Sequence, residues 1–140
     1  VFLIDEQVDH GPVVAERKIT GVESMDYKTL HDKLAEIGAA LLLEVMPEFV
    51  KNTHKLRAQR ESEATFTKKF DVEDAYVDLN KDDSKTVERK IRALNPEPGV
   101  WTTQKVNEKT KRLKILEAEL KDGKLVLKKI QWEGGKPQTL

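Results

Sequence analysis

The sequence predicts an α+β protein built from two unequal parts. Residues 1–51 contain two short apolar segments and one long segment with helical periodicity, which predict two strands and a long helix. Residues 64–140 contain short alternating segments around a single helical one, a pattern typical of a small β-barrel of the oligonucleotide/oligosaccharide-binding (OB) type. Residues 52–63 are polar and rich in basic residues, without periodicity, and are interpreted as a linker.

The net charge of zero conceals a reversal near this linker. Residues 1–50 hold 4 Lys and Arg against 10 Asp and Glu, whereas residues 51–140 hold 21 against 15. Such a reversal favours two units with different partners, the basic one facing an anionic molecule. A solvated surface of mixed charge that binds nothing explains the same counts.

Composition excludes several classes of protein. The chain has no Cys, which excludes disulfides, thiolate metal sites and a cysteine nucleophile. No apolar run approaches the roughly 20 residues that a membrane-spanning helix needs. We therefore expect a soluble intracellular protein. Its expected location is the cytoplasm, or an organellar matrix if the source is eukaryotic, and we expect it to be a monomer.

The first part begins with Val1–Ile4, interpreted as a buried strand, and a second strand is predicted at residues 13–19. Between them lies an acidic loop that ends in a Gly11-Pro12 turn. A parallel strand needs a crossover connection before it, so we expect that residue 1 is not the start of the natural protein.

A long helix is predicted from about Asp26 to Val50. Asp26 or Ser24 can cap its start, and Pro47 is expected to kink it or to restart it as a final turn. Its apolar residues recur every three or four positions and predict one buried face. They are Leu30, Leu34, Ile37, Leu41, Val45 and Phe49.

The second part is predicted to be mainly β-structure. Short extended segments are expected at 64–70 and 76–79, and a helix from residues 82–84 to Asn95, where the following proline ends it. Three antiparallel strands follow, at 100–106, 112–120 and from Leu125 onward. Asp122-Gly123 is a strong hairpin signal between the last two strands.

The residues give one compact candidate for chemistry, the opening loop. Asp5, Glu6, Asp9 and His10 cluster there, and a carboxylate could raise the basicity of a neighbouring His or accept a proton from an attacking amine. An ordinary acidic turn explains the same residues. No metal constellation, phosphate-binding glycine loop or serine nucleophile motif is found.

A second set of candidates is basic. Lys68, Lys69 and the helix cluster of Arg89, Lys90 and Arg92 can meet phosphates, as can Lys105, Lys109, Lys111, Arg112 and Lys114 around the first hairpin. Trp101 and Trp132 can stack on bases or belong to the core.

Several stretches, in this order, resemble the methionyl-tRNA formyltransferases. Residues 3–15 resemble the end of the catalytic domain of folate-dependent formyltransferases. The remaining stretches resemble the carboxyl-terminal domain, and they are 62–69, 88–96 with Pro98-Gly99, 113–118 and 131–137.

The resemblance implies a fold and a reaction. Residues 1–51 would end a Rossmann-like α/β formyltransferase domain, and 64–140 would form the OB-like tRNA-binding domain. Such enzymes transfer a formyl group from 10-formyltetrahydrofolate to the amino group of methionyl initiator tRNA in translation initiation, without a metal.

The resemblance also implies site residues. Asp9 takes the place of the catalytic Asp of the family, and Gln7, Val8 and Asp9 would form the lower wall of the folate pocket. The Asn and His of the family belong to an earlier segment, so the chain alone is expected to be inactive. The residues that match tRNA contacts are Lys68, Lys69, Arg89 and Arg92. For Arg92 a structural role, bracing the linker or the Asp78 region, is the alternative.

Three positions depart from the pattern of the family. Arg60 replaces an acidic residue, Leu79 a Trp, and Glu97 an aromatic residue. Two alternatives stay open: part of a sugar-nucleotide N-formyltransferase, and an RNA-binding module without catalysis.

Overall fold

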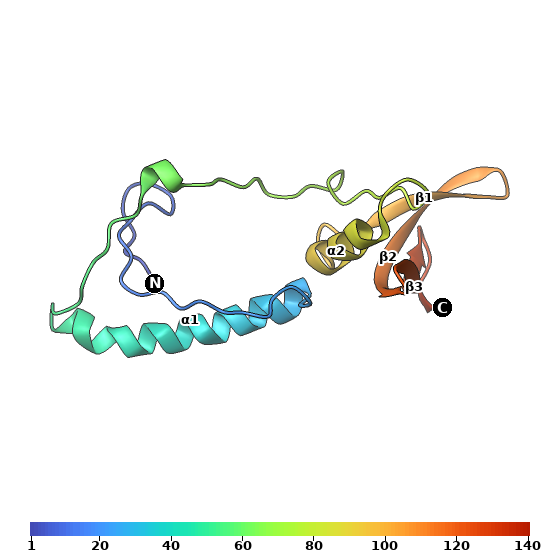
Figure 1. Ribbon diagram of the computed structural model, residues 1–140. Coiled ribbons are helices and arrows are strands. Elements are labelled where there is room, and N and C mark those ends of the chain that lie inside the picture. The colour runs from blue at the N-terminus through green and yellow to red at the C-terminus, as the bar shows by residue number, and fades with distance from the viewer. The chain divides into compact units, whose positions relative to one another are not determined.

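The computed structural model describes residues 1–140, and the chain divides into two compact units, Val1–Thr67 and Lys68–Leu140. Figure 1 shows the helices and strands of both. The division falls after Thr67, whereas the sequence placed a linker at 52–63, and the predicted domain limits stay a prediction. We describe each unit by itself.

The first unit is dominated by helix α1, Tyr27–Val50, which confirms the predicted helix. The Asp26 side chain accepts a hydrogen bond from the Thr29 backbone N–H at 2.8 Å, as a helix cap should. The helix continues through Pro47, one turn before its end. Asn52, at φ 53°, then turns the chain out of the helix in the left-handed conformation that commonly follows a last turn.

The apolar face of α1 is mostly uncovered within this unit. Leu41 is buried, but Leu34 and Phe49 are 47% and 38% exposed. No other helix or strand of the unit packs against this face, so the periodicity predicted the helix correctly and its burial only in part.

The two strands predicted in the first unit, at residues 1–4 and 13–19, do not form, because neither segment pairs with a neighbour over more than isolated bridges. Phe2 and Val13 form one isolated antiparallel bridge, and Val13 forms another with Arg57. The Val13 N–H donates to the Arg57 carbonyl at 2.8 Å, and the Arg57 N–H returns a bond of 2.9 Å. Ile4, expected to be buried, is 90% exposed. An apolar run becomes a strand only when a neighbouring strand pairs along it, and here each run finds a partner at one residue.

The second unit contains helix α2, Ser84–Leu94, and four strands. Asp83 caps α2 by accepting from the Thr86 N–H at 2.9 Å. The strands are β1 (Trp101–Val106), β2 (Lys109–Lys121), β3 (Lys124–Trp132) and β4 (Pro137–Thr139). They form one antiparallel sheet in the order β1-β2-β3-β4, and α2 packs against β2 and β3.

The two hairpin turns of this sheet, β1–β2 and β2–β3, contain residues with positive φ. Asp122 and Gly123 have φ of 50° and 75°, and Asn107 and Glu108 have φ of 48° and 63°. Two consecutive residues of positive φ are typical of the type I′ hairpin, whose twist suits the flanking strands. The predicted hairpin at Asp122-Gly123 is confirmed.

Neither of the two segments predicted to be short strands or extended chain becomes a strand. The segment 64–70 forms none, and 76–79 contributes one parallel bridge, between Tyr76 and Trp101. Strand β4 was not predicted. The structure therefore shows an α+β arrangement with an antiparallel sheet, and the OB-like barrel stays a prediction.

The core of the second unit lies between α2 and the sheet. Its buried members are Ala75, Val77, Val87, Ile91, Leu94, Val100 and Ile115. Neither helix of the structure combines the length and the apolar character needed to cross a membrane.

Asn95 joins the end of α2 to the middle of the sheet. Its Nδ2 donates to the carbonyls of Ile115 and Leu116, at 2.9 and 3.0 Å, and its Oδ1 accepts from the Val100 N–H at 2.9 Å. The register of β2 with β3 shifts at this point, between Ile115 and Glu117. One side chain thus satisfies three backbone groups where the ladder is irregular.

Candidate functional site

The opening loop is closed by backbone contacts that require a glycine. The Leu3 N–H donates to the Pro12 carbonyl at 3.0 Å. Gly11 is buried against Leu3, and a Cβ at Gly11 would lie 1.7 Å from the Leu3 carbonyl oxygen. No side chain fits there without a backbone shift, so Gly11 fixes how tightly the loop closes.

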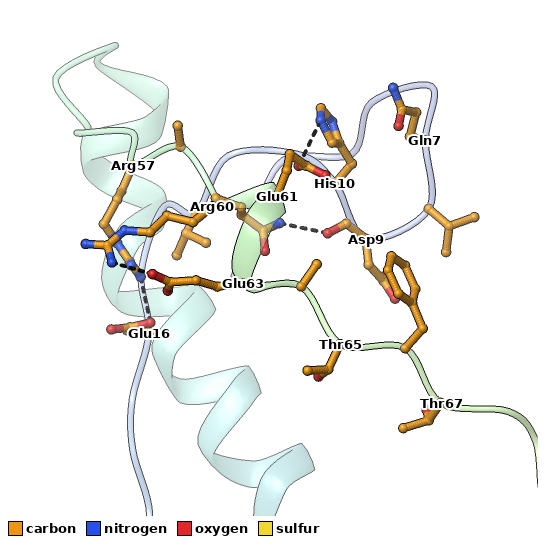
Figure 2. A pocket seen from close by; sticks show the side chains of 16 residues that line it. Gln7, Asp9, His10, Glu16, Arg57, Arg60, Glu61, Glu63, Thr65 and Thr67 are labelled. Carbon is orange, nitrogen blue, oxygen red and sulfur yellow. Dashed lines mark hydrogen bonds and ion pairs between the residues drawn. The ribbon is translucent and has the colours of Figure 1, made fainter.

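Asp9 stands at the turn of this loop with φ 56°, a left-handed conformation that Asp tolerates better than most residues. Its carboxylate has no hydrogen bond or ion pair in the structure, although its carbonyl does. Figure 2 shows Asp9 beside the groove. The carboxylate is therefore free to accept a proton or a hydrogen bond.

Gln59 holds this turn from a distant part of the sequence. Its Nε2 donates to the carbonyls of Asp9 and Gly11, at 2.7 and 2.8 Å. Gln59 is not among the site residues predicted from the sequence. Its only signal was an amide side chain in a largely basic segment, which is too weak to predict a contact across 50 residues.

His10 lies between two carboxylates. Its Nδ1 is 2.6 Å from Asp5 Oδ2, and its Nε2 is 3.2 Å from Glu61 Oε1. The hydrogen bond and charge of Asp5, followed by the charge of Glu61, raise the pKa of His10. The hydrogen bond from His10 and a second one from the Gln7 N–H lower the pKa of Asp5. Protonated His10 can therefore bridge the loop to the short 3₁₀ helix Glu61–Glu63.

These elements surround an open groove of about 1000 Å³ in the first unit (Figure 2). Gln7, Val8 and Asp9 line one part of it, so the structure brings the predicted cofactor residues to the same cavity. Val8 and Phe66 present apolar side chains that are each 91% exposed.

The arginines of the groove are neutralised by partners. Arg57 Nη2 lies 2.7 Å from Glu16 Oε2, and Arg60 Nη1 lies 2.7 Å from Glu63 Oε1. Arg60, one of the departures from the pattern of the family, thus forms a local ion pair beside the groove.

The four predicted tRNA-binding residues belong to the second unit and differ in their surroundings. Lys68 forms an ion pair with Asp74 at 2.8 Å, which raises the pKa of Lys68, and Arg92 Nε lies 2.5 Å from Glu88 Oε1. Lys69 and Arg89 are exposed and make no ion pair or side-chain hydrogen bond. No contact brings the four together as one cluster.

Lys90 of α2 was also predicted to meet phosphates, but in the structure it holds the preceding segment of the chain. Its Nζ donates to the carbonyls of Asp74 and Tyr76, both at 3.1 Å. This lysine is therefore engaged in the fold and is not available to a ligand in this arrangement.

Comparisons with known proteins match both units. The family described as "Formyl transferase, C-terminal domain" matches residues 69–124. Over 123 residues, 88% of the chain, the sequence is 32% identical to proteins named methionyl-tRNA formyltransferase from Brucella ovis and Brucella canis. A protein of the same name from Mesorhizobium japonicum is 33% identical over the same length. The chain spans 40% of the length of the Brucella relatives and 38% of the Mesorhizobium relative.

Proposed function

We infer that the chain belongs to the formyltransferases, from the match of its C-terminal domain and its similarity to the methionyl-tRNA formyltransferases, and on this premise we propose that it takes part in formyl transfer to methionyl initiator tRNA. The donor in this proposal is 10-formyltetrahydrofolate, and the acceptor is the amino group of the esterified methionine. The observation that carries the proposal is the similarity to enzymes of that name over 88% of the chain. The same observation favours tRNA over a sugar nucleotide as acceptor.

Asp9 is the residue to which we assign proton transfer. Its unpartnered carboxylate faces an open groove, where it can accept the proton that the attacking amine loses. The new N–C bond forms to the formyl carbon, and the bond of that carbon to the donor nitrogen breaks, so that tetrahydrofolate leaves. The Gln59 amide and the glycine closure at Gly11 hold the backbone on either side of it. A carboxylate on a fixed turn is oriented before the reactants arrive.

Gln7, Val8 and Asp9 fit one wall of a pocket for the folate donor. An exposed apolar side chain, a free side-chain amide and a free carboxylate are groups that bind and orient a flat polar ring. The donor, when bound, supplies an activated formyl carbon. The carbonyls of Asp9 and Gly11 are already bonded to Gln59, so these two groups shape the wall rather than bind the donor.

The remaining assignments follow from the same proposal. Residues 1–51 would end a Rossmann-like α/β domain, and 64–140 would form an OB-like domain that holds the tRNA. Lys69 and Arg89 are free to contact phosphates, whereas Lys68 and Arg92 would do so by sharing or leaving their carboxylate partners. We place the protein, as a monomer, in the cytoplasm or in an organellar matrix, where initiator tRNA is used.

Replacement of the proposed catalytic carboxylate tests this function. In the complete enzyme that carries this chain, Asp9→Asn should lower kcat for formylation about 10²-fold or more, because an amide cannot accept the proton. The affinity for tRNA should change little. Glu6→Gln is the matched control, because it removes the same charge from an exposed residue of the same loop. Wild-type turnover by the Asp9→Asn enzyme would overturn the assignment.

A further inference from the structure

We propose that one face of the β1–β2 hairpin is the main RNA-backbone contact of the second unit. This hairpin basic face consists of Lys105, Arg112 and Lys114 with the hydroxyls of Thr103 and Thr110. The inference rests on the proposed function for the identity of the RNA. It differs from the earlier assignment to Lys68, Lys69, Arg89 and Arg92.

The first argument is the absence of countercharge. The hairpin residues 101–114 include five basic residues and one acidic residue, Glu108. None of these five basic residues forms an ion pair in the structure, whereas Lys68, Arg92, Lys128 and Lys129 of the same unit all do. Uncompensated cations are costly to gather on one element, and a polyanion that binds there relieves their repulsion.

The second argument is the register of the strands, which puts the cations on one face. Cross-strand partners share a face of the sheet, and Trp101 pairs with Lys114, Thr103 with Arg112, and Lys105 with Thr110. The alternate residues Thr102 and Leu113 are buried, so they mark the opposite face as the one toward the core. The hairpin basic face therefore looks outward.

The third argument is the fixed position of Arg112. Its guanidinium carbon lies 4.0 Å from the centre of the Trp101 ring. Trp101 is itself held by a hydrogen bond from Nε1 to the Val72 carbonyl, at 2.7 Å, and by an edge contact with Tyr76. Such stacking orients the planar fork before any ligand arrives.

The hydrogen-bonding capacity of Arg112 is unused. Its Nε is buried without a partner, and the guanidinium makes no hydrogen bond or ion pair with another residue. Glu133 lies next to Arg112 through a backbone bond of 3.0 Å but forms no ion pair with it. A phosphate cannot reach the buried Nε, but the two Nη groups also make no hydrogen bond or ion pair, and phosphate oxygens are suitable acceptors for them.

The chemistry of the face favours an RNA backbone over a protein partner. It offers two flexible ammonium groups, one oriented guanidinium and two hydroxyls, which are the groups that contact phosphate and sugar. Its one aromatic residue, Trp101, is partly buried and lies under Arg112, and the face has no exposed large apolar side chain of the kind that a protein interface needs at its centre. Contacts of this type give affinity that depends on salt but not on sequence.

Charge removal in the complete enzyme tests the inference. The variant Lys105→Gln/Lys114→Gln should raise the KM for methionyl-tRNA and the Kd for tRNA about tenfold at low salt, with kcat unchanged. The slope of log affinity against log salt should fall by about one for each cation removed. The matched control is Lys109→Gln/Lys111→Gln, which removes the same charge from the alternate positions of the same hairpin.

Arg112→Lys separates orientation from charge. The variant keeps the positive charge but loses the guanidinium group that stacks on Trp101. The Kd for tRNA should therefore rise several-fold, while the slope of log affinity against log salt stays the same. A wild-type Kd for this variant would contradict the role of the stack on Trp101.

The outcomes separate this inference from the proposed function. Equal losses in the face variant and in the control would overturn the assignment to one face, and so would wild-type Kd and KM in the face variant. Weaker tRNA binding by the face variant alone supports the face even if the enzyme formylates no tRNA. If the face variant formylates normally with an unchanged KM, the proposed function stands and the assignment of RNA binding to the hairpin basic face is wrong.

Discussion

At the scale of single residues, the opening loop is held mainly through its backbone and leaves its side chains free. Gln59 occupies the carbonyls of Asp9 and Gly11, and Gly11 supplies the space for the closure, while the Asp9 carboxylate has no partner. A site of this kind fixes the position of a reactive group without using its hydrogen-bonding capacity. Because the loop is held through backbone groups and not through the Asp9 carboxylate, Asp9→Asn should change the reaction more than the fold.

His10 gives the loop a dependence on pH. The bridge from Asp5 through His10 to Glu61 needs a charged imidazole and charged carboxylates. The raised pKa of His10 means that its contribution is complete below about pH 6.5 and is lost as pH rises through the raised value. The lowered pKa of Asp5 means that its contribution is complete above about pH 3.9 and is lost as pH falls through the lowered value. The bridge should therefore be strongest between about pH 4 and 6.5.

An NMR titration of the His10 imidazole checks this prediction. Asp5→Asn should lower the pKa of His10, because the largest cause of its rise is removed. Glu61→Gln should lower it less, because the Glu61 contact is longer and contributes only through its charge. A larger effect of Glu61→Gln than of Asp5→Asn would contradict the described geometry.

At the scale of elements, the second unit depends on the link between α2 and β2. Asn95 is the residue that makes it, because both of its amide functions are bonded to backbone groups of the sheet or its approach. The two carbonyls, of Ile115 and Leu116, lie where the register of β2 with β3 shifts. Sequence reasoning placed Asn95 only at the end of a helix, before a proline.

Removal of this link should destabilise the second unit. Asn95→Ala leaves two carbonyls and one N–H without their partner, which should lower the free energy of unfolding by about 2 kcal/mol or more. Asn95→Asp should destabilise as well, because a carboxylate would face two carbonyl oxygens. Urea denaturation followed by tryptophan fluorescence reports this unit, which contains both Trp101 and Trp132.

The control for this experiment is Asn80→Ala, since the exposed Asn80 side chain makes no hydrogen bond. It should leave the urea midpoint nearly unchanged. An Asn95→Ala midpoint equal to that of the control would show that solvent replaces the three bonds without loss.

At the scale of the whole molecule, local sequence patterns predicted the helices and one hairpin, but they did not predict contacts between residues that are far apart in the sequence. Periodicity and caps predicted α1 and α2, and Asp122-Gly123 predicted its hairpin. Strand β4 was missed because three exposed residues carry no alternation, and the strand at 13–19 was wrong because pairing depends on a neighbour that the sequence does not reveal. The contact of Gln59 with the loop joins residues about fifty positions apart, so no local pattern could predict it.

The proposed division of the active site predicts the behaviour of this chain on its own. The 140-residue chain should not formylate methionyl-tRNA even with excess 10-formyltetrahydrofolate, because the resemblance assigns the other two catalytic residues to a segment outside it. A formylation assay beside the complete enzyme measures this. Turnover by the chain alone would contradict the assignment of only one of the three catalytic residues, Asp9, to this chain.

The edges of the four-stranded sheet have a consequence for the protein at high concentration. β4 is three residues long and begins with Pro137, which lacks an N–H to offer a further strand. On the other edge, Trp101 is already bonded to the backbone of Ala75 and Val77, and the exposed charge of Lys105 follows. A long free edge is what lets one molecule add its strand to another, and both edges here are shortened or charged. Concentrated solutions of the second unit should therefore resist fibrous aggregation.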